Sequence, residues 1–203
     1  MRSVLVLFIS FLSLSLSHGQ TFSAFSVALN GGSGSSMVDY DGDGDLDIYV
    51  TLGNNNNNAL LENDGLGNFV LVTTHPLIQQ TNWDTQSSTW ADFDNDGDLD
   101  VFMPTGGSGN VPIQYNLFFE NLGGGNFTLA SVGGPTGYQV KCNSTGTADY
   151  DNDGLLDILL CARDGQDSLF RNNGSLNFTS VNTPMDNISS WSTNTLFSDL
   201  DND

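Results

Sequence analysis

The chain has 203 residues, of which 24 are Asp or Glu and four are Lys or Arg, so its formal net charge at pH 7 is −20. Binding to nucleic acid requires a basic surface that releases counterions, so this composition excludes DNA and RNA as partners. Because 38% of the residues are hydrophobic and the acidic residues are clustered, we expect a folded chain rather than a disordered polyanion.

The first residues have the pattern of a secretory signal peptide. A basic residue, Arg2, precedes an apolar run from Val4 to Leu16, and the small residue Gly19 follows. This pattern predicts a leader over residues 1–19. The run is shorter than the roughly 20 apolar residues that span a bilayer, and no later segment approaches that length. We therefore expect a secreted or cell-surface protein with no transmembrane segment. Removal of the leader takes away Arg2 and leaves the basic residues Lys141, Arg163 and Arg171, so the net charge of the mature chain is three minus 24, or −21.

An acidic motif of nine residues recurs along the chain after this leader. Its copies are Asp39–Asp47 (DYDGDGDLD), Asp92–Asp100 (DFDNDGDLD) and Asp149–Asp157 (DYDNDGLLD), and a fourth begins at Asp199. The starts are separated by 53, 57 and 50 residues. Repeats of this length indicate a modular architecture. Each complete copy precedes an apolar run typical of a strand buried on both faces, namely Ile48–Val50, Val101–Met103 and Ile158–Leu160.

A second motif lies between the acidic copies. It is an apolar run, an Asn/Gly-rich turn and a Phe that opens another β-prone run, at Leu60–Phe69, Leu117–Phe127 and Leu169–Phe178. Apolar runs joined by Asn-Gly clusters predict hairpins. Each repeat thus supplies about four strands, which is the content of one propeller blade. We predict an all-β fold, a β-propeller of four-stranded blades, with repeats near 28–72, 73–132 and 133–182 and a truncated one at 183–203.

Both ends of the expected propeller domain, residues 20–203, suggest an incomplete ring. Residues 21–27 can be laid over 126–132, the last strand of a repeat, and Asp203 falls inside the fourth acidic motif. Closed propellers have four to eight blades. We therefore expect about three full blades and the start of a fourth.

The acidic motif has the ligand chemistry of a calcium site. Ca²⁺ takes six to eight oxygen ligands, and Asp at positions 1, 3, 5 and 9 of a nine-residue loop supplies four carboxylates. Position 7 would contribute its backbone carbonyl, because this position is Asp in two copies but Leu in the third. The predicted ligands are Asp39, Asp41, Asp43, Asp45 and Asp47 in the first loop, Asp92, Asp94, Asp96, Asp98 and Asp100 in the second, and Asp149, Asp151, Asp153, Leu155 and Asp157 in the third.

The acidic motif has two alternative interpretations, an acidic turn without metal and an EF-hand, and both are disfavoured. An acidic turn without metal is disfavoured, because two carboxylates about 4 Å apart repel by roughly 1 kcal/mol even in bulk water. An EF-hand would place a Glu at position 12 of the loop. Here that position is Val50, Met103 or Leu160, inside an apolar run, so the EF-hand interpretation fails in all three copies.

The motif D-[FY]-D-x-D-G-x-x-D before an apolar run resembles the FG-GAP/VCBS repeat of the integrin α-subunit propeller. The intervening L-[FY]-x-N-x-G element is similar to repeats of cartilage acidic protein-like proteins. This resemblance covers nearly all of residues 21–203. It implies a calcium-binding propeller of about seven blades with its metal loops on one side of the ring, and it identifies no ligand.

We expect extracellular binding or adhesion, with a protein or carbohydrate ligand, and no catalysis by this chain. One histidine, His75, remains after the leader, so no arrangement with a second histidine is available. The alternative is that the propeller is a non-catalytic part of a larger secreted enzyme, for example one acting on carbohydrate. Cys142 and Cys161 flank one loop and can pair in an oxidising compartment, although a hairpin would put Cys161 opposite a residue near Thr145. Three tryptophans could line a sugar-binding face or pack between blades: Trp83, Trp90 and Trp191.

Overall fold

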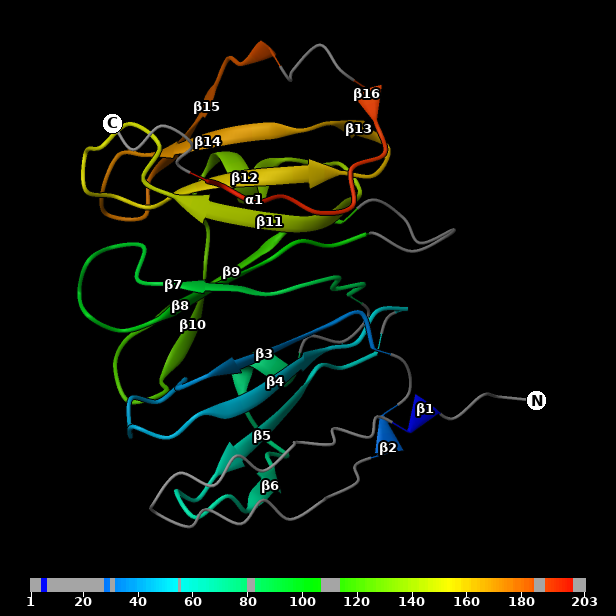
Figure 1. Ribbon diagram of the computed structural model, residues 1–203, viewed down its shortest axis with the longest axis vertical. Coiled ribbons are helices and arrows are strands. Elements are labelled where there is room, and N and C mark those ends of the chain that lie inside the picture. The colour runs from blue at the N-terminus through cyan, green and yellow to red at the C-terminus, as the bar shows by residue number, and fades with distance from the viewer. Residues whose placement is uncertain are drawn as a thin grey trace.

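The computed structural model describes residues 5–6, 28–29, 32–54, 56–79, 83–106, 114–184 and 189–198. Three four-stranded antiparallel sheets make up most of this part and are stacked in chain order along the long axis (Figure 1). The first sheet contains β3 (Gly34–Val38), β4 (Asp47–Thr51), β5 (Ala59–Asn63) and β6 (Phe69–Leu71). The second contains β7 (Thr89–Ala91), β8 (Asp100–Met103), β9 (Leu117–Asn121) and β10 (Phe127–Ala130). The third contains β11 (Cys142–Ala148), β12 (Asp157–Ala162), β14 (Ser168–Asn172) and β15 (Phe178–Val181).

Short elements connect or extend these sheets. A 3-10 helix, η1 (Pro76–Ile78), lies between the first and second sheets, and a one-turn helix, α1 (Gly134–Gly137), lies between the second and third. Two small antiparallel pairs join β1 (Leu5–Val6) to β2 (Ala28–Leu29) and β13 (Gly165–Gln166) to β16 (Ser189–Ser190). In the described part of the chain, neither helix has the length and hydrophobicity needed to cross a bilayer.

The apolar runs after the acidic motifs form the buried second strand of each sheet. All residues of β4 and β8 are buried, as are all but one of β12. The fourth strands β10 and β15, in contrast, expose their central residues. The prediction of an all-β fold built from four-stranded propeller blades is confirmed.

Two hydrophobic cores lie between adjacent sheets, and β8 contributes to both. Val101 and Met103 belong to the core against the first sheet, with Tyr49 and Leu60, while Phe102 belongs to the core against the third. Successive side chains of a strand point to opposite faces, so one apolar run can serve two interfaces. The core between the second and third sheets is rich in aromatic rings, including Phe93, Phe102, Phe118, Phe170 and Phe178.

The first strands of neighbouring sheets meet through small polar residues in a constant register. The Ser36 hydroxyl contacts the Ser88 hydroxyl at 2.9 Å, and Thr89 hydrogen-bonds to Thr145 one repeat later. At the next repeat, a Cβ added to Gly146 would lie 2.8 Å from Cγ2 of Thr195. Residues 191–198 therefore lie beside β11 where the first strand of a fourth sheet belongs.

The N-terminal predictions fall mainly outside the described residues. Of the expected leader, residues 1–19, the structure describes Leu5–Val6 only, and the expected outer strand at 21–27 lies outside the described part. Cys142 and Cys161 are both buried and free. Cys161 pairs with Ser144, one residue from the expected Thr145, and an irregularity between Cys142 and Ser144 places Cys142 opposite Ala162.

Candidate metal centre

Each acidic loop joins the first strand of a sheet to the second. The first loop (Asp39–Asp47) links β3 to β4, the second (Asp92–Asp100) links β7 to β8, and the third (Asp149–Asp157) links β11 to β12. The three loops follow one another along the left edge of the molecule in Figure 1. The repeat therefore presents the same acidic surface three times on one side of the stack.

Carboxylate oxygens converge within each loop. One oxygen from each of three aspartates lies within 4.8 Å of the other two. Oxygens that share a Ca²⁺ ion at 2.3–2.6 Å are at most about 5 Å apart, so this spacing fits one calcium ion per cluster. The clusters are Asp39, Asp41 and Asp43 in the first loop, Asp92, Asp94 and Asp96 in the second, and Asp149, Asp151 and Asp157 in the third.

Backbone N–H groups hold the aspartate at position 1. Asp39 Oδ1 accepts from the backbone N–H of Asp43 at 3.1 Å, and Oδ2 accepts from Gly44 at 3.0 Å. The same pair of bonds recurs at Asp92 and at Asp149. The glycine at position 6 makes this possible because its φ is positive, at 96° in Gly44.

The aspartate at position 9 is the most buried aspartate of each loop. Asp47, Asp100 and Asp157 are at most 1% exposed. In each, Oδ1 accepts at 2.8 Å from a backbone N–H at the end of the third strand of the sheet. Burial raises the pKa of Asp47 to about 6 and that of Asp100 to about 7, against the opposing effect of these hydrogen bonds. A nearby cation would offset this cost of burying the charged form.

The side chain at position 7 points toward a turn of its own sheet. A Cβ added to Gly65, in the turn between β5 and β6, would lie 2.4 Å from Asp45 Oδ2. Asp98 stands in the same relation to Gly123, and Leu155 to Gly174. This orientation agrees with a position 7 that uses only its carbonyl, although the carbonyl ligand itself stays a prediction.

The sequence reasoning missed a recurring asparagine that joins the loops to one another. Asn121, the last residue of β9, donates from Nδ2 to the Leu99 carbonyl of its own loop at 3.3 Å and to the Tyr40 carbonyl of the first loop at 3.2 Å. Asn172, the last residue of β14, donates likewise to Leu156 at 3.2 Å and to Phe93 of the second loop at 2.7 Å. The asparagine recurs in the L-[FY]-x-N motif, and this recurrence is the signal in the sequence for a shared contact. From the sequence alone, the asparagine is interpreted only as a turn residue.

The residue before this asparagine differs between the sheets. It is Glu62 in β5, Glu120 in β9 and Arg171 in β14, and each is paired with the fourth strand in the same register. The Tyr40 hydroxyl donates to Glu62 at 3.4 Å. The Arg171 side chain instead contacts the third loop, with Nε 2.7 Å from Asp151 Oδ2 and Nη2 donating to Asp153 Oδ2 at 2.8 Å.

The histidine and two of the tryptophans singled out in the sequence make contacts within the protein. His75 Nδ1 accepts from the backbone N–H of Leu77 at 3.3 Å, and its Nε2 lies 3.0 Å from the Gly125 carbonyl. Trp90 packs edge-on against Tyr49 and Phe127 between the first two sheets. Trp191 is 65% exposed beneath the Arg163 guanidinium, so packing between sheets describes Trp90 but not Trp191.

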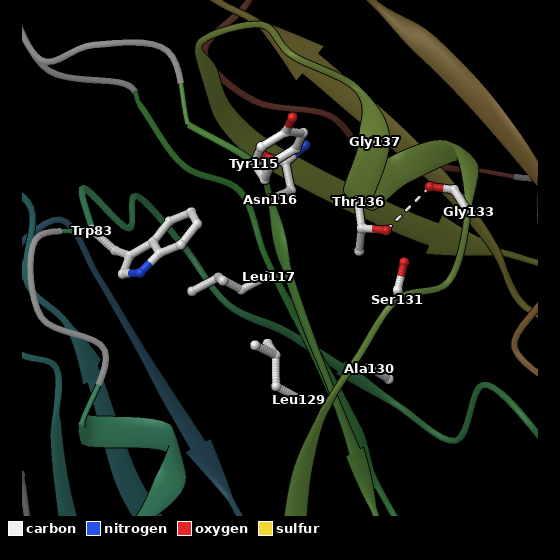
Figure 2. Close-up of a pocket in the computed structure, with 10 residues that line it drawn as sticks. All are labelled: Trp83, Tyr115, Asn116, Leu117, Leu129, Ala130, Ser131, Gly133, Thr136 and Gly137. Carbon is white, nitrogen blue, oxygen red and sulfur yellow. Dashed lines mark hydrogen bonds between the residues drawn. The ribbon is translucent and has the colours of Figure 1, made fainter.

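Trp83 lines a pocket of about 570 Å³ at the opposite end of the second sheet from its acidic loop. Figure 2 shows Trp83 on one side of this pocket, Ser131 and Thr136 on the other, and the Leu117 and Leu129 side chains between them. Its volume is in the range of small-molecule sites. The Thr136 hydroxyl donates to the Gly133 carbonyl at 3.1 Å and accepts from the Val132 backbone N–H at 3.3 Å. The pocket therefore has an aromatic side chain on one side and the Ser131 hydroxyl on the other.

A scan against family models matches the FG-GAP-like repeat over residues 39–103 and 149–203, together more than half of the chain. The chain belongs to the FG-GAP-like repeat family. The first match begins at position 1 of the first loop and includes all of the second, and the other begins at position 1 of the third. No curated protein matches the chain significantly. The matched residues thus contain the three acidic loops and the second strand that follows each of them.

Proposed function

We propose that this FG-GAP-like protein is a secreted calcium-binding propeller module that binds an extracellular protein or carbohydrate, rather than an enzyme. The observation that carries the calcium proposal is the convergence of three carboxylates within 4.8 Å in loops whose backbone already fixes their orientation. The converging positions are 1, 3 and 5 in the first and second loops and 1, 3 and 9 in the third. Calcium would neutralise these carboxylates and brace the first two strands of each sheet.

Electrostatics supports the proposal independently of the motif. The first and second loops each hold five aspartates, and a glutamate lies on the adjacent third strand. Burial is the largest cause of the raised pKa of Asp41 and Asp94, and neighbouring carboxylates, including Glu62 and Glu120, raise it further. Uncompensated like charges of this density destabilise a fold, whereas a divalent cation removes the repulsion.

Calcium titration by calorimetry tests this function. Extracellular calcium modules have Kd values of roughly 10⁻⁴ to 10⁻³ M, so at about 1 mM calcium each site with Kd near 10⁻⁴ M should add about 1.4 kcal/mol of stability. The double variant Asp39→Asn with Asp43→Asn should lose one site. Asp164→Asn, which removes one exposed aspartate outside the loops, is the control and should bind calcium as the wild type does. A protein that binds no calcium, and whose melting temperature a chelator leaves unchanged, would contradict the proposal.

The binding role is supported by the Trp83 pocket. An aromatic side chain opposite a hydroxyl suits a sugar ring, whose C–H face packs on the aromatic and whose hydroxyls bond to a side chain such as Ser131 on the other side. Tyr115, 53% exposed at the rim, adds a second aromatic. Calorimetry with a panel of monosaccharides should identify a ligand that Trp83→Ala no longer binds, while Trp191→Ala binds it normally. Binding that survives Trp83→Ala would place the ligand elsewhere.

The alternative role, a non-catalytic propeller within a larger secreted enzyme, makes the same calcium prediction. It differs in requiring hydrolysis of a polysaccharide by the protein as secreted. An assay of the culture medium against soluble polysaccharides, with and without expression of the gene, separates the two roles. Ligand binding without product formation supports the binding module.

A further inference from the structure

We infer that the three loops are not equivalent, and that Arg171 serves as a built-in cation of the third loop in place of strong calcium binding there. The inference rests on the proposed calcium function and specifies which loops carry it. Arg171 occupies the strand position of Glu62 and Glu120, as the common pairing with the fourth strand shows. One substitution thus replaces an acidic neighbour of the loop by a basic one.

The contacts of Arg171 use the carboxylates that a metal ion requires. Its Nε lies 2.7 Å from Oδ2 of Asp151 at position 3, and its Nη2 lies 2.8 Å from Oδ2 of Asp153 at position 5. The other oxygen of Asp153 accepts the backbone N–H of Leu155 at 3.0 Å. Oδ2 of Asp151 and Oδ2 of Asp153 can therefore coordinate calcium only after the guanidinium leaves them.

The arrangement of the third loop differs accordingly. In the first two loops the converging oxygens come from positions 1, 3 and 5, whereas in the third they come from positions 1, 3 and 9. Asp153, which is held by Arg171, is missing from the cluster. The third cluster thus has the spacing of the other two but lacks the aspartate at position 5, whose Oδ2 accepts from Arg171.

Charge points in the same direction. Counting the residue on the adjacent strand, the first loop has five aspartates and Glu62, and the second has five aspartates and Glu120. The third has four aspartates, with Leu155 at position 7, and the opposite charge of Arg171. Negative charge beside a site attracts a divalent cation and a positive guanidinium repels it, even where these groups are not ligands. We expect the third loop to bind calcium at least tenfold more weakly than the other two.

Calcium calorimetry on the full chain tests this inference. The wild type should bind two calcium ions tightly, and Arg171→Glu, which restores the acidic residue of the other sheets, should bind three. Arg163→Glu makes the same charge change at an arginine that stacks on Trp191, and should leave two sites. Three equivalent sites in the wild type, or two in Arg171→Glu, would overturn the inference. No sites in any protein would refute the proposed function itself, and the inference with it.

Hydrogen exchange of the wild type provides a test that needs no variant. Chelation should accelerate amide exchange in β4 and β8, which follow the first and second loops, and leave β12 nearly unchanged, because Arg171 stays in place. Equal acceleration in all three strands would overturn the inference even if Arg171→Glu failed to fold.

Discussion

Truncation of Asn121 tests whether one asparagine per repeat holds neighbouring sheets together. Its side chain makes three hydrogen bonds: Nδ2 donates to the Tyr40 and Leu99 carbonyls at 3.2 and 3.3 Å, and Oδ1 accepts from the Gly123 backbone at 3.1 Å. Asn121 is 2% exposed, so water cannot readily replace the lost partners. At about 1 kcal/mol per bond, Asn121→Ala should lower the free energy of unfolding by about 3 kcal/mol.

The first sheet provides the matched control. Asn63 also makes three side-chain hydrogen bonds, to the Leu46 carbonyl at 3.1 Å and from the Gly65 and Gly67 backbone at 3.2 Å each. All three lie within its own sheet and are partly open to water, so Asn63→Ala should cost only about 1 kcal/mol. The expected difference of about 2 kcal/mol combines the bond to the first sheet, about 1 kcal/mol, with the deeper burial of the two bonds inside the second sheet.

Equilibrium unfolding in urea at saturating calcium measures both losses. With a slope near 2 kcal/mol per molar urea, the two variants should differ by about 1 M in their midpoints. Equal midpoints would show that the bond from Asn121 to the first loop contributes nothing measurable. A changed slope in Asn121→Ala alone would instead indicate that the sheets unfold separately.

Further predictions concern α1 and the buried thiols. A Cβ at Gly134 would lie 2.6 Å from the Phe170 ring, whereas Gly137 of the same helix has nothing within 4 Å, so Gly134→Ala should cost about 1–3 kcal/mol and Gly137→Ala almost nothing in thermal unfolding. Burial raises the pKa of Cys142 to about 12 and also raises that of Cys161, so both thiols should stay protonated at about pH 8. Thiol reagents should therefore label them only after denaturation, and rapid labelling of the native protein would contradict this burial.

Local pattern was sufficient to predict the strands and loops. The apolar runs after each acidic motif became β4, β8 and β12, because a continuous run of this kind is stable only when both faces are covered. The Asn/Gly clusters became the turns between the third and fourth strands, where left-handed residues such as Gly65 and Gly124 occur. Signals of this kind depend on neighbours within a few residues and are visible in one sequence.

Contacts between repeats could not be predicted in the same way. The bond from Asn121 to Tyr40 joins residues 81 positions apart, and its geometry depends on how two sheets stack. The ion pairs of Arg171 depend on the register of β14 against the third loop, so a motif that reads as a third equivalent copy carries a different local charge. Repetition predicted three identical sites because a repeat describes what its copies share and conceals their differences.

The recurring asparagine makes the acidic loops and the sheet interfaces one connected structure. Asp100 at position 9 of the second loop accepts from the backbone of Asn121, whose side chain donates to Tyr40 in the first loop. Asp157 of the third loop is connected through Asn172 to Phe93 of the second in the same way. An ion that fixes one loop therefore also fixes the strand end that caps the preceding loop. Because each of these contacts joins two adjacent sheets, we expect the stack to gain rigidity when a loop is neutralised, by calcium as proposed for the first two loops or by the ion pairs of Arg171 in the third.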